Sequence, residues 1–395
     1  MTTITSADQT VSVLGFDDIM GRIRRFAPRI RERVQDIEDQ RRLPMDLVDG
    51  LRECGVFRAA MPAEWGGPEL TSMEQISLVE EVAKIDGSVA WCVMIGMDSG
   101  IYAGFLRPDA ARVVYPELDM ITAGLVLPVG QAYEVDGGYR VDGHWRFGSG
   151  CTHADWIVGG CSVYRDGQPV LEPWGAPIWR LILAPRSAFT IEDNWRTTGL
   201  AGTGSSDYSV RGLYVPAEHL FAFDQPFRDS PLYRAGADAI TRKMSGVPLG
   251  VARAAIDYVY DLAEGRMDYP NTPWKQARRV RVAVAECEMR LAAARSAVYS
   301  SVEDLWQRLA ASEQPTRQER ATAALARYHA FRTARDITGT LYDLVGGDAV
   351  YRERTPLDRH LRDMTTACQH FVGQHKIVEL AGQMLLGEEP DIPLI

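Results

Sequence analysis

The sequence lacks several features that would place it in a common protein class. Its 395 residues include six cysteines, and no two of them stand in a Cys-x-x-Cys pair typical of metal or redox sites. No apolar run approaches the ~20 residues of a membrane-spanning helix, and no basic segment followed by an apolar run opens the chain. We therefore expect a cytoplasmic protein with reduced thiols and no metal site.

Basic charge and a nucleotide-binding motif are also scarce. Lysine and arginine total 43 against 53 for aspartate and glutamate, a net charge of -10. A nucleic-acid-binding surface needs excess cations to neutralise phosphates, so nucleic acid is not an expected partner. Gly202-Thr203-Gly204-Ser205 begins like a dinucleotide-binding loop but lacks its third glycine and follows no strand–helix unit. We therefore expect no nicotinamide site in this chain.

Hydrophobic periodicity divides the chain into three expected domains. Residues 1–119 repeat apolar side chains at spacings of three and four, which predicts a helical domain. Residues 120–225 change to short alternating runs with glycine turns, which predicts a β domain of about six to eight strands, in a barrel or sandwich. Residues 226–395 return to helical spacing and predict an up-and-down four-helix bundle. The fold class is therefore α+β.

Two finer predictions concern turns and the last bundle connection. Asp136-Gly137-Gly138 and Asp142-Gly143 are hairpin turn signals in the β domain. Residues 344–376 begin with Gly346-Gly347, which ends one helix, and continue as a charged connection toward a last helix over 375–386. Such a break between apolar helices is where a bundle can open to a ligand, although a solvated loop would look the same.

Three segments, taken in order, resemble the acyl-CoA dehydrogenase superfamily. They are MPAEWGG at 61–67, GLAGTGSSDYSVRGLYVPAEHLF at 199–221 and LVGGDAVYRERTPLDRHLRD at 344–363. The resemblance covers nearly the whole chain. It implies the domain order given above, a homotetramer, and a flavin between the β domain and the bundle.

The chain departs from the dehydrogenases of this superfamily at their catalytic base. The loop after Arg362-Asp363 contains TTACQHFVG, without a carboxylate, and residues 223–263 hold no glutamate at the family's second position for the base. A thioester α-proton is a weak acid, so loss of the positioned base should remove dehydrogenation. The family's Thr-Glu-Pro flavin signature is also replaced, by AGLVLPVGQ at 123–131.

The remaining features resemble the two-component (group D) flavin-dependent monooxygenases: aromatic hydroxylases, dibenzothiophene monooxygenase and nitrososynthases. The shared motifs are Trp-x-Phe-x-Ser-Gly at 145–150 and a histidine, His370, that six residues separate from Arg362-Asp363. The resemblance implies an enzyme that receives reduced FAD or FMN from a separate NAD(P)H:flavin reductase. The reduced flavin would form a C4a-hydroperoxide and oxygenate an aromatic, polycyclic or amino-bearing small molecule. An acyl-CoA dehydrogenase or oxidase with a displaced base, and a non-catalytic flavoprotein, stay open as alternatives.

The same resemblance suggests catalytic residues. His370 stands where the dehydrogenases place their base, and an imidazole that titrates near neutral pH can exchange a proton with a peroxide or a substrate. A histidine bonded only to backbone groups is the alternative. Ser149 could hydrogen-bond near flavin N5 or the peroxide, or could simply be a turn serine. Trp145 and Phe147 are expected near the flavin, although Trp145 could equally fill the core of the sheet.

Three further residues are expected to bind the cofactor. Arg266 matches a family arginine that contacts the flavin pyrophosphate of a neighbouring subunit, although it could be a solvent-exposed helix-end arginine. Gly346 and Gly347 would allow a close backbone approach, although a helix C-cap also explains them. The substrate pocket is expected to use five side chains, with a structural hydrogen bond as the alternative for His153: Trp91, Met97, Asp98, His153 and Met244.

Overall fold

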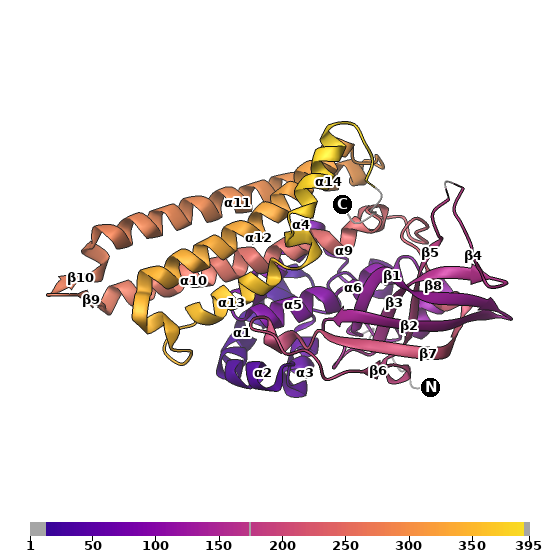
Figure 1. Cartoon of the computed structure of the whole chain (residues 1–395), viewed down its shortest axis with the longest axis horizontal. Helices are drawn as coiled ribbons and strands as arrows, with labels where there is room; N and C mark the ends of the chain where they lie inside the picture. Colours follow the sequence, from indigo (N-terminus) through magenta and orange to yellow (C-terminus); the bar gives the residue numbers. More distant parts are fainter. Residues whose placement is uncertain (1–12, 174, 391–395) are drawn as a thin grey trace, which may run out of the picture.

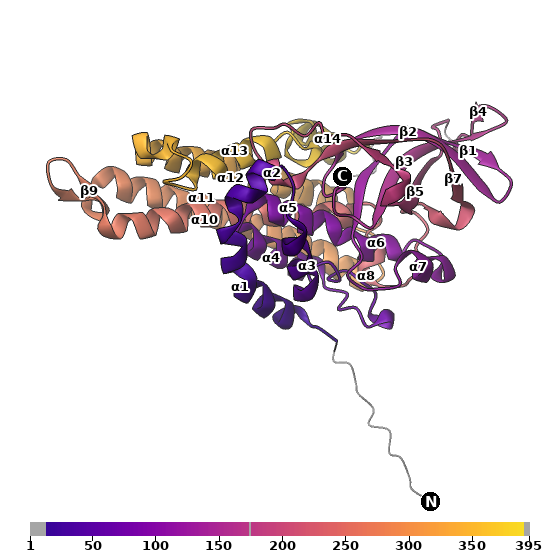
Figure 2. The ribbon, with the colours of Figure 1, turned by 90° about the horizontal axis from the view of Figure 1, so that it is seen from below.

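The computed structural model describes residues 13–173 and 175–390. The start of the first predicted domain, at residue 1, and the end of the last, at residue 395, therefore lie outside the described residues. Helices, a β-sheet and then long helices follow one another along the chain (Figure 1). The sheet lies at one end of the molecule, the long helices extend toward the other, and the N-terminal helices pack between them on one side (Figure 2). This is the predicted order of secondary structure.

The N-terminal region is helical because short capped segments alternate with turns. The Thr71 hydroxyl accepts from the Glu74 N–H while the Glu74 carboxylate accepts from the Thr71 N–H, a reciprocal cap that starts α4. The Asp86 carboxylate caps α5 by accepting from the Val89 N–H at 3.0 Å. The helices are α1 (Phe16–Glu32), α2 (Val34–Gln40), α3 (Met45–Cys54), α4 (Ser72–Ala83), α5 (Gly87–Gly96), α6 (Asp98–Ala103) and α7 (Pro108–Val114).

The middle region is one mixed sheet in the order β6-β7-β2-β1-β3-β5-β8, with β4 beside β3. The β1–β3 pair is parallel and the other pairs are antiparallel. Trp145, Phe189 and Tyr208 pack ring against ring in its core. The strands are β1 (Thr122–Val135), β2 (Gly138–Gly148), β3 (Trp156–Arg165), β4 (Gln168–Pro169), β5 (Trp179–Pro185), β6 (Thr190–Ile191), β7 (Ser206–Pro216) and β8 (Leu220–Phe221).

One of the two predicted hairpin turns is present. Strands β1 and β2 pair up to Val135 and Gly138, so Asp136-Gly137 forms the turn. The second prediction was wrong, because Gly143 lies inside β2 at a shift in its register with β7. A Cβ added at Gly143 would lie 2.3 Å from the Trp145 ring. This glycine therefore makes room for a buried tryptophan, which local sequence cannot distinguish from a turn.

The C-terminal region contains three long helices and two short ones that together form the bundle. Helix α12 packs against α10, α11, α13 and α14. The helices are α8 (Pro231–Arg234), α9 (Asp238–Arg242), α10 (Gly246–Gly265), α11 (Arg278–Ala310), α12 (Arg317–Val345), α13 (Leu357–Ala367) and α14 (Lys376–Leu385). A small hairpin of β9 (Met267–Asp268) and β10 (Thr272–Pro273) joins α10 to α11 at the end away from the sheet (Figure 1).

The prediction of a charged connection before the last helix needs correction. Helix α13 occupies part of it, and a short 3-10 turn, Phe371–Gly373, separates α13 from α14. The helical signal was present, because Leu357, His360, Met364 and Ala367 follow one another at spacings of three and four and are all buried. Charged residues on the opposite face hid it. The fourth member of the bundle is thus two short helices with His370 at their junction.

Glycines allow the bundle to lie close to the N-terminal helices. A Cβ at Gly246 would lie 2.6 Å from the Ile76 carbonyl oxygen, and one at Gly250 would lie 2.2 Å from that of Glu80. Helix α10 can therefore pack directly on the backbone of α4. Among the described residues, no helix combines the length and apolar character that a membrane crossing needs. All six cysteines are free and buried.

Candidate active site

A chain of buried hydroxyl groups lies where helix α5 meets the end of β2. The Trp91 Nε1–H donates to Ser149 Oγ at 3.1 Å, and Ser149 Oγ lies 2.7 Å from Ser205 Oγ. Ser205 Oγ is in turn 2.7 Å from Thr203 Oγ1, which donates to the Leu200 carbonyl at 2.8 Å. Because Thr203 donates its proton to Leu200, Ser205 donates to Thr203 and Ser149 donates to Ser205. Ser149 Oγ therefore keeps only acceptor capacity beyond its contact with Trp91.

His370 lies beside this chain of hydroxyls. Its ring meets the Trp91 ring edge to face, with centroids 5.4 Å apart and planes at 74°. Nδ1 accepts from the Val372 N–H at 3.4 Å, and Nε2 has no hydrogen-bond partner among the described residues. The Nδ1 contact assigns the proton of the neutral ring to Nε2. The structure thus brings together His370, Ser149 and Trp91, which the sequence analysis assigned to the catalytic and substrate sets.

The expected near-neutral titration of His370 needs correction. Burial, followed by the nearby Arg327 guanidinium, lowers the pKa of His370 to about 4. The ring is therefore neutral at physiological pH and presents an Nε2–H. It can donate a hydrogen bond without first gaining a proton from solvent.

The Trp-x-Phe-x-Ser-Gly motif divides its two aromatic rings between core and surface. Trp145 is fully buried, stacks on Tyr208 at 5.4 Å and donates Nε1–H to the Gly160 carbonyl at 2.9 Å. The structure therefore corrects its assignment as a flavin contact and supports the core alternative. Phe147 is 54% exposed and has a φ of +62°, which is unfavourable for a bulky residue. A register shift between β2 and β7 after Trp145 coincides with the change in direction.

Arg266, Gly346 and Gly347 lie together at the far end of the bundle. Arg266 donates Nη2–H to the Val345 carbonyl at 3.1 Å and pairs with Asp348 at 3.1 Å. The turn that carries His370 is joined to the same helix at Phe331, where the Cys368 thiol donates to the carbonyl at 3.4 Å. At 1.5 Å per residue along α12, Phe331 and Val345 are about 20 Å apart. One chain therefore does not bring these residues to Ser149.

The other predicted pocket residues are all buried, with different partners. Asp98 forms a buried ion pair with Lys243, and burial raises the pKa of Asp98 to about 6. Met97 and Met244 pack in the main hydrophobic core. Neither ring nitrogen of His153 has a hydrogen-bond partner among the described residues, so its expected structural hydrogen bond is not found. Burial and then the neighbouring Arg52 and Arg186 lower the pKa of His153 to about 4.

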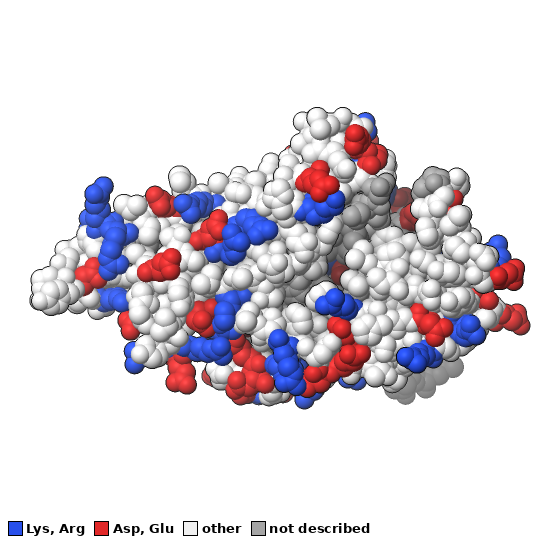
Figure 3. Space-filling model, viewed as in Figure 1, with Lys and Arg blue, Asp and Glu red and all other residues white. Residues whose placement is uncertain are grey.

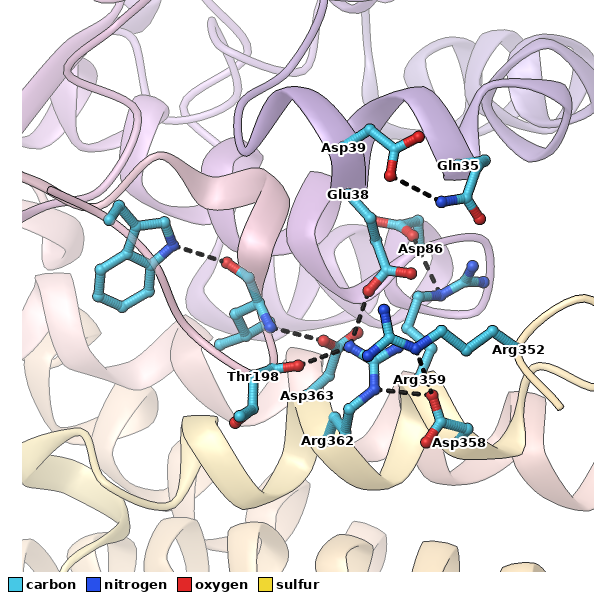
Figure 4. Close-up of polar contacts among 12 residues, drawn as sticks. Gln35, Glu38, Asp39, Asp86, Thr198, Arg352, Asp358, Arg359, Arg362 and Asp363 are labelled. Atoms are coloured by element: carbon cyan, nitrogen blue, oxygen red, sulfur yellow. Dashed lines mark hydrogen bonds and ion pairs between the residues drawn. The ribbon is translucent and has the colours of Figure 1, made fainter. Parts of the chain in front are cut away.

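Arg362 and Asp363 form a polar network that the sequence analysis did not predict. In the sequence, the pair served only to locate His370. Arg362 binds Asp358 at 2.7 Å and Glu38 of α2 at 2.8 Å (Figure 4). Asp363 Oδ1 accepts from the Leu200 N–H at 2.6 Å. Burial, then Asp86, raises the pKa of Asp363 to about 7. These contacts tie α13 to the N-terminal helices and to the loop after β6, and so fix the start of the segment that leads to His370.

The surface is hollowed between the bundle and the sheet (Figure 3). Helix α5 packs against α13, and its Trp91 contacts both Ser149 at the end of β2 and His370 after α13. The described residues of this region thus supply three hydroxyl groups, an indole N–H and a neutral imidazole. They supply no carboxylate at the position of His370.

Comparison with known proteins agrees with this geometry. Models of the acyl-CoA dehydrogenase N-terminal and C-terminal domains match residues 17–106 and 243–375. The indole-3-acetate monooxygenase of Pseudomonas putida is 32% identical over 366 residues, covering 92% of each chain. The chain belongs to the flavin-dependent monooxygenases of the acyl-CoA dehydrogenase superfamily.

Other relatives of this family agree. The oxygenase subunit HsaA of a flavin-dependent monooxygenase of Rhodococcus jostii is 29% identical over 87% of this chain and 91% of its own. The crystal structure of the 3-HSA hydroxylase of Rhodococcus sp. RHA1 superposes with a TM-score of 0.88 at 27% identity, over 96% of this chain and 99% of that one. The predicted fold class and the monooxygenase assignment are confirmed, and the chain is a flavin-dependent oxidoreductase.

Proposed function

We propose that this monooxygenase is the oxygenase component of a two-component system and oxygenates an aromatic small molecule. Its reduced FAD or FMN would come from a separate NAD(P)H:flavin reductase. The contact between His370, Trp91 and Ser149 carries this proposal, because it puts a neutral imidazole where a dehydrogenase needs a carboxylate. The relatives' names support it, since they include an oxygenase subunit and an indole-3-acetate monooxygenase. A cytoplasmic location stays a prediction.

The residues at the end of β2 fit a flavin. Phe147 is an exposed aromatic ring held in a strained backbone conformation, which is typical of a residue positioned for a ligand. Ser149 presents a buried hydroxyl two residues later. Reduced flavin supplies the electrons that activate molecular oxygen. Phe147 would cover the ring system and Ser149 would hydrogen-bond to it.

His370 and Trp91 would position hydrogen-bonding groups and exclude water at the site. The Nε2–H of neutral His370 can donate a hydrogen bond to an oxygen atom at the reaction centre and stabilise negative charge there. The Trp91 ring packs against His370, and its Nε1–H holds the Ser149 hydroxyl. Together they orient one donor, His370 Nε2–H, and one acceptor, Ser149 Oγ, while an apolar surface excludes water.

We propose a homotetramer in which a second copy completes the cofactor site. Arg266 and Gly346-Gly347 would then meet the flavin of a neighbour, since they lie about 20 Å along α12 from the His370 turn. A Cβ built at Gly347 would meet open space among the described residues beyond its chain neighbours, so close packing within the described chain does not explain this glycine. Tyr269 and Met289, on the same part of the bundle, are 98% and 64% exposed, which suits a surface that a second copy covers.

The proposed function is tested by isotope incorporation. The full chain is mixed with a flavin reductase, NADH, FAD or FMN, and ¹⁸O₂, with a panel of phenols, indoles and aryl acids. We expect one ¹⁸O atom in the product of at least one compound, and none when the reductase is left out. Oxidation of an acyl-CoA thioester without oxygen incorporation would instead identify a dehydrogenase. Oxygen uptake no faster than that of free reduced flavin would identify a non-catalytic flavoprotein.

A further inference from the structure

A buried cluster of charged side chains lies next to the candidate active site and takes no part in the chemistry described so far. Its cations are Arg242, Lys243 and Arg327, which are 3%, 1% and 3% exposed. Its anions are Asp98 and Asp238. The cluster, called here the cationic cluster, therefore carries one more positive than negative charge. A net charge away from water is unfavourable unless an opposite charge compensates it.

The internal contacts of the cationic cluster use only part of its hydrogen-bonding capacity. Arg242 Nε lies 2.6 Å from Asp238 Oδ2. Arg327 Nη1 donates to Thr241 Oγ1 at 2.9 Å and lies 3.6 Å from Asp238 Oδ1. Lys243 pairs with Asp98. These contacts anchor the three cations and determine which of their donors remain.

The remaining donors form the edge of a guanidinium group. Arg327 Nε and Nη2 are buried and have no hydrogen-bond partner among the described residues, and Arg242 Nη1 is in the same state. Nε and Nη2 lie on the same side of a guanidinium and are the pair that binds a carboxylate through two parallel hydrogen bonds. A buried donor without a partner costs stability, which points to a ligand that supplies the acceptors.

The cationic cluster touches the active site from two directions. Arg327 is close enough to His370 to lower the pKa of that ring. One helical turn after Arg327, the Phe331 carbonyl accepts from Cys368 and so holds the His370 turn on α12. On the other side, Asp98 begins α6 directly after α5, the helix that carries Trp91. A molecule bound beside Trp91 and His370 could therefore extend toward Arg327.

We propose that the substrate carries a carboxylate, which Arg327 binds through Nε and Nη2 with help from Arg242 Nη1. The substrate class would be an aromatic acid with a short side chain, its ring beside Trp91 and His370. This inference rests on the proposed function. The phosphate groups of the flavin are a different source of negative charge, and the experiment separates the two.

The test compares ligands that differ only in charge. Binding of indole-3-acetate and indole-3-acetamide, and of phenylacetate and phenylacetamide, is measured by calorimetry on the full chain with oxidised FAD, so that no turnover occurs. At least one acid should bind wild-type protein about 10-fold or more tightly than its amide, as expected for charge-assisted hydrogen bonds. This comparison needs no variant and so cannot fail through misfolding.

Three variants assign the effect to Arg327. Arg327→Met should weaken acid binding about 10- to 100-fold and leave the amide and the flavin unchanged, while Arg327→Lys should recover part of the loss. Arg335→Met is the control, because Arg335 lies on the same helix in an exposed pair with Asp336. Circular dichroism melts check that each variant is folded.

Several outcomes would overturn the carboxylate site. Equal binding of acid and amide for both rings, or no binding of either acid, would exclude it. Weaker flavin binding by Arg327→Met with unchanged acid binding would show that the cluster serves the cofactor. Tight acid binding with no ¹⁸O incorporation would leave the anion site intact and contradict the proposed function instead.

Discussion

The two ends of the C-terminal bundle differ in how much of a site one chain can build. At the sheet end, Trp91, Ser149 and His370 come from three separate segments and are already in contact. At the far end, Arg266 and Gly347 lie side by side without any partner from the sheet. The sheet end is thus assembled by folding alone, whereas the far end requires association if it is to reach a cofactor.

The two ends also differ in their polar contacts. The sheet end is a buried chain of hydroxyls whose members fix one another's positions. The far end holds an exposed ion pair, Arg266 with Asp348, and Arg266 also lies 4.9 Å above the Trp274 ring. Exposed pairs contribute little to stability and can exchange partners. Chemistry is therefore expected at the sheet end, and affinity for the cofactor at the far end.

The largest effect is expected from His370→Ala at the sheet end. Loss of a positioned hydrogen-bond donor should lower product formation by about 10²–10³-fold. Flavin affinity should stay the same, and hydrogen peroxide should replace the product, because activated oxygen is no longer protected. Product and peroxide are measured together in the reductase-coupled assay. Since the pKa of His370 is about 4, the ring stays neutral between pH 6 and 8, and wild-type activity should not change through its titration in this range.

His375→Ala is the matched control for this prediction. His375 is an exposed histidine five residues further on, at the start of α14. Its removal should leave product and peroxide unchanged. A His370→Ala variant that forms product at the wild-type rate, with the same yield per oxygen, would show that His370 only caps the turn at Phe371.

A smaller effect is expected from Arg266→Met at the far end. Loss of a bidentate phosphate contact should weaken flavin binding about 10- to 100-fold while product formation at saturating flavin stays within a few-fold of wild type. Flavin affinity is measured by titration, and sedimentation gives the state of association. Arg279→Met, in an exposed pair with Asp268 nearby, is the control.

Mixing the two variants tests whether the ends belong to one site. If a neighbour's Arg266 completes the site, subunits of His370→Ala and Arg266→Met refolded together should recover part of the activity at low flavin. Sites with both native residues then form between different chains. No recovery, or a stable monomer at micromolar concentration, would show that Arg266 does not act across an interface.

The same contrast explains how much could be predicted from sequence. Periodicity was sufficient for the order of the three regions, and the motif at 145–150 singled out Ser149, which the structure brings into contact with Trp91. The motif alone could not show which of Trp145 and Phe147 is buried, because a register shift in β2 decides it. The charged face of α13 obscured its helical periodicity. The spacing along the long helix α12 gave no sign that Arg327 is buried. Burial of a charge depends on tertiary packing, which spacing alone does not reveal.

The smallest effect concerns Asp363, which links the start of the His370 segment to the Leu200 loop. Its folded pKa of about 7 is raised from 3.8, so the folded chain keeps a proton that the unfolded chain releases. This group's contribution to stability is therefore complete below about pH 4 and is lost as the pH rises to about 7.

Asp363→Asn stays neutral throughout and can still accept from the Leu200 N–H. Its melting temperature should equal that of wild type near pH 4 and exceed it by a few degrees at pH 8, corresponding to roughly 1–4 kcal/mol. The exposed Asp336→Asn is the control. A lower melting temperature for Asp363→Asn at pH 8 would mean that the carboxylate is ionised in the fold, held by Arg359, and that the link to the active site is an ion pair.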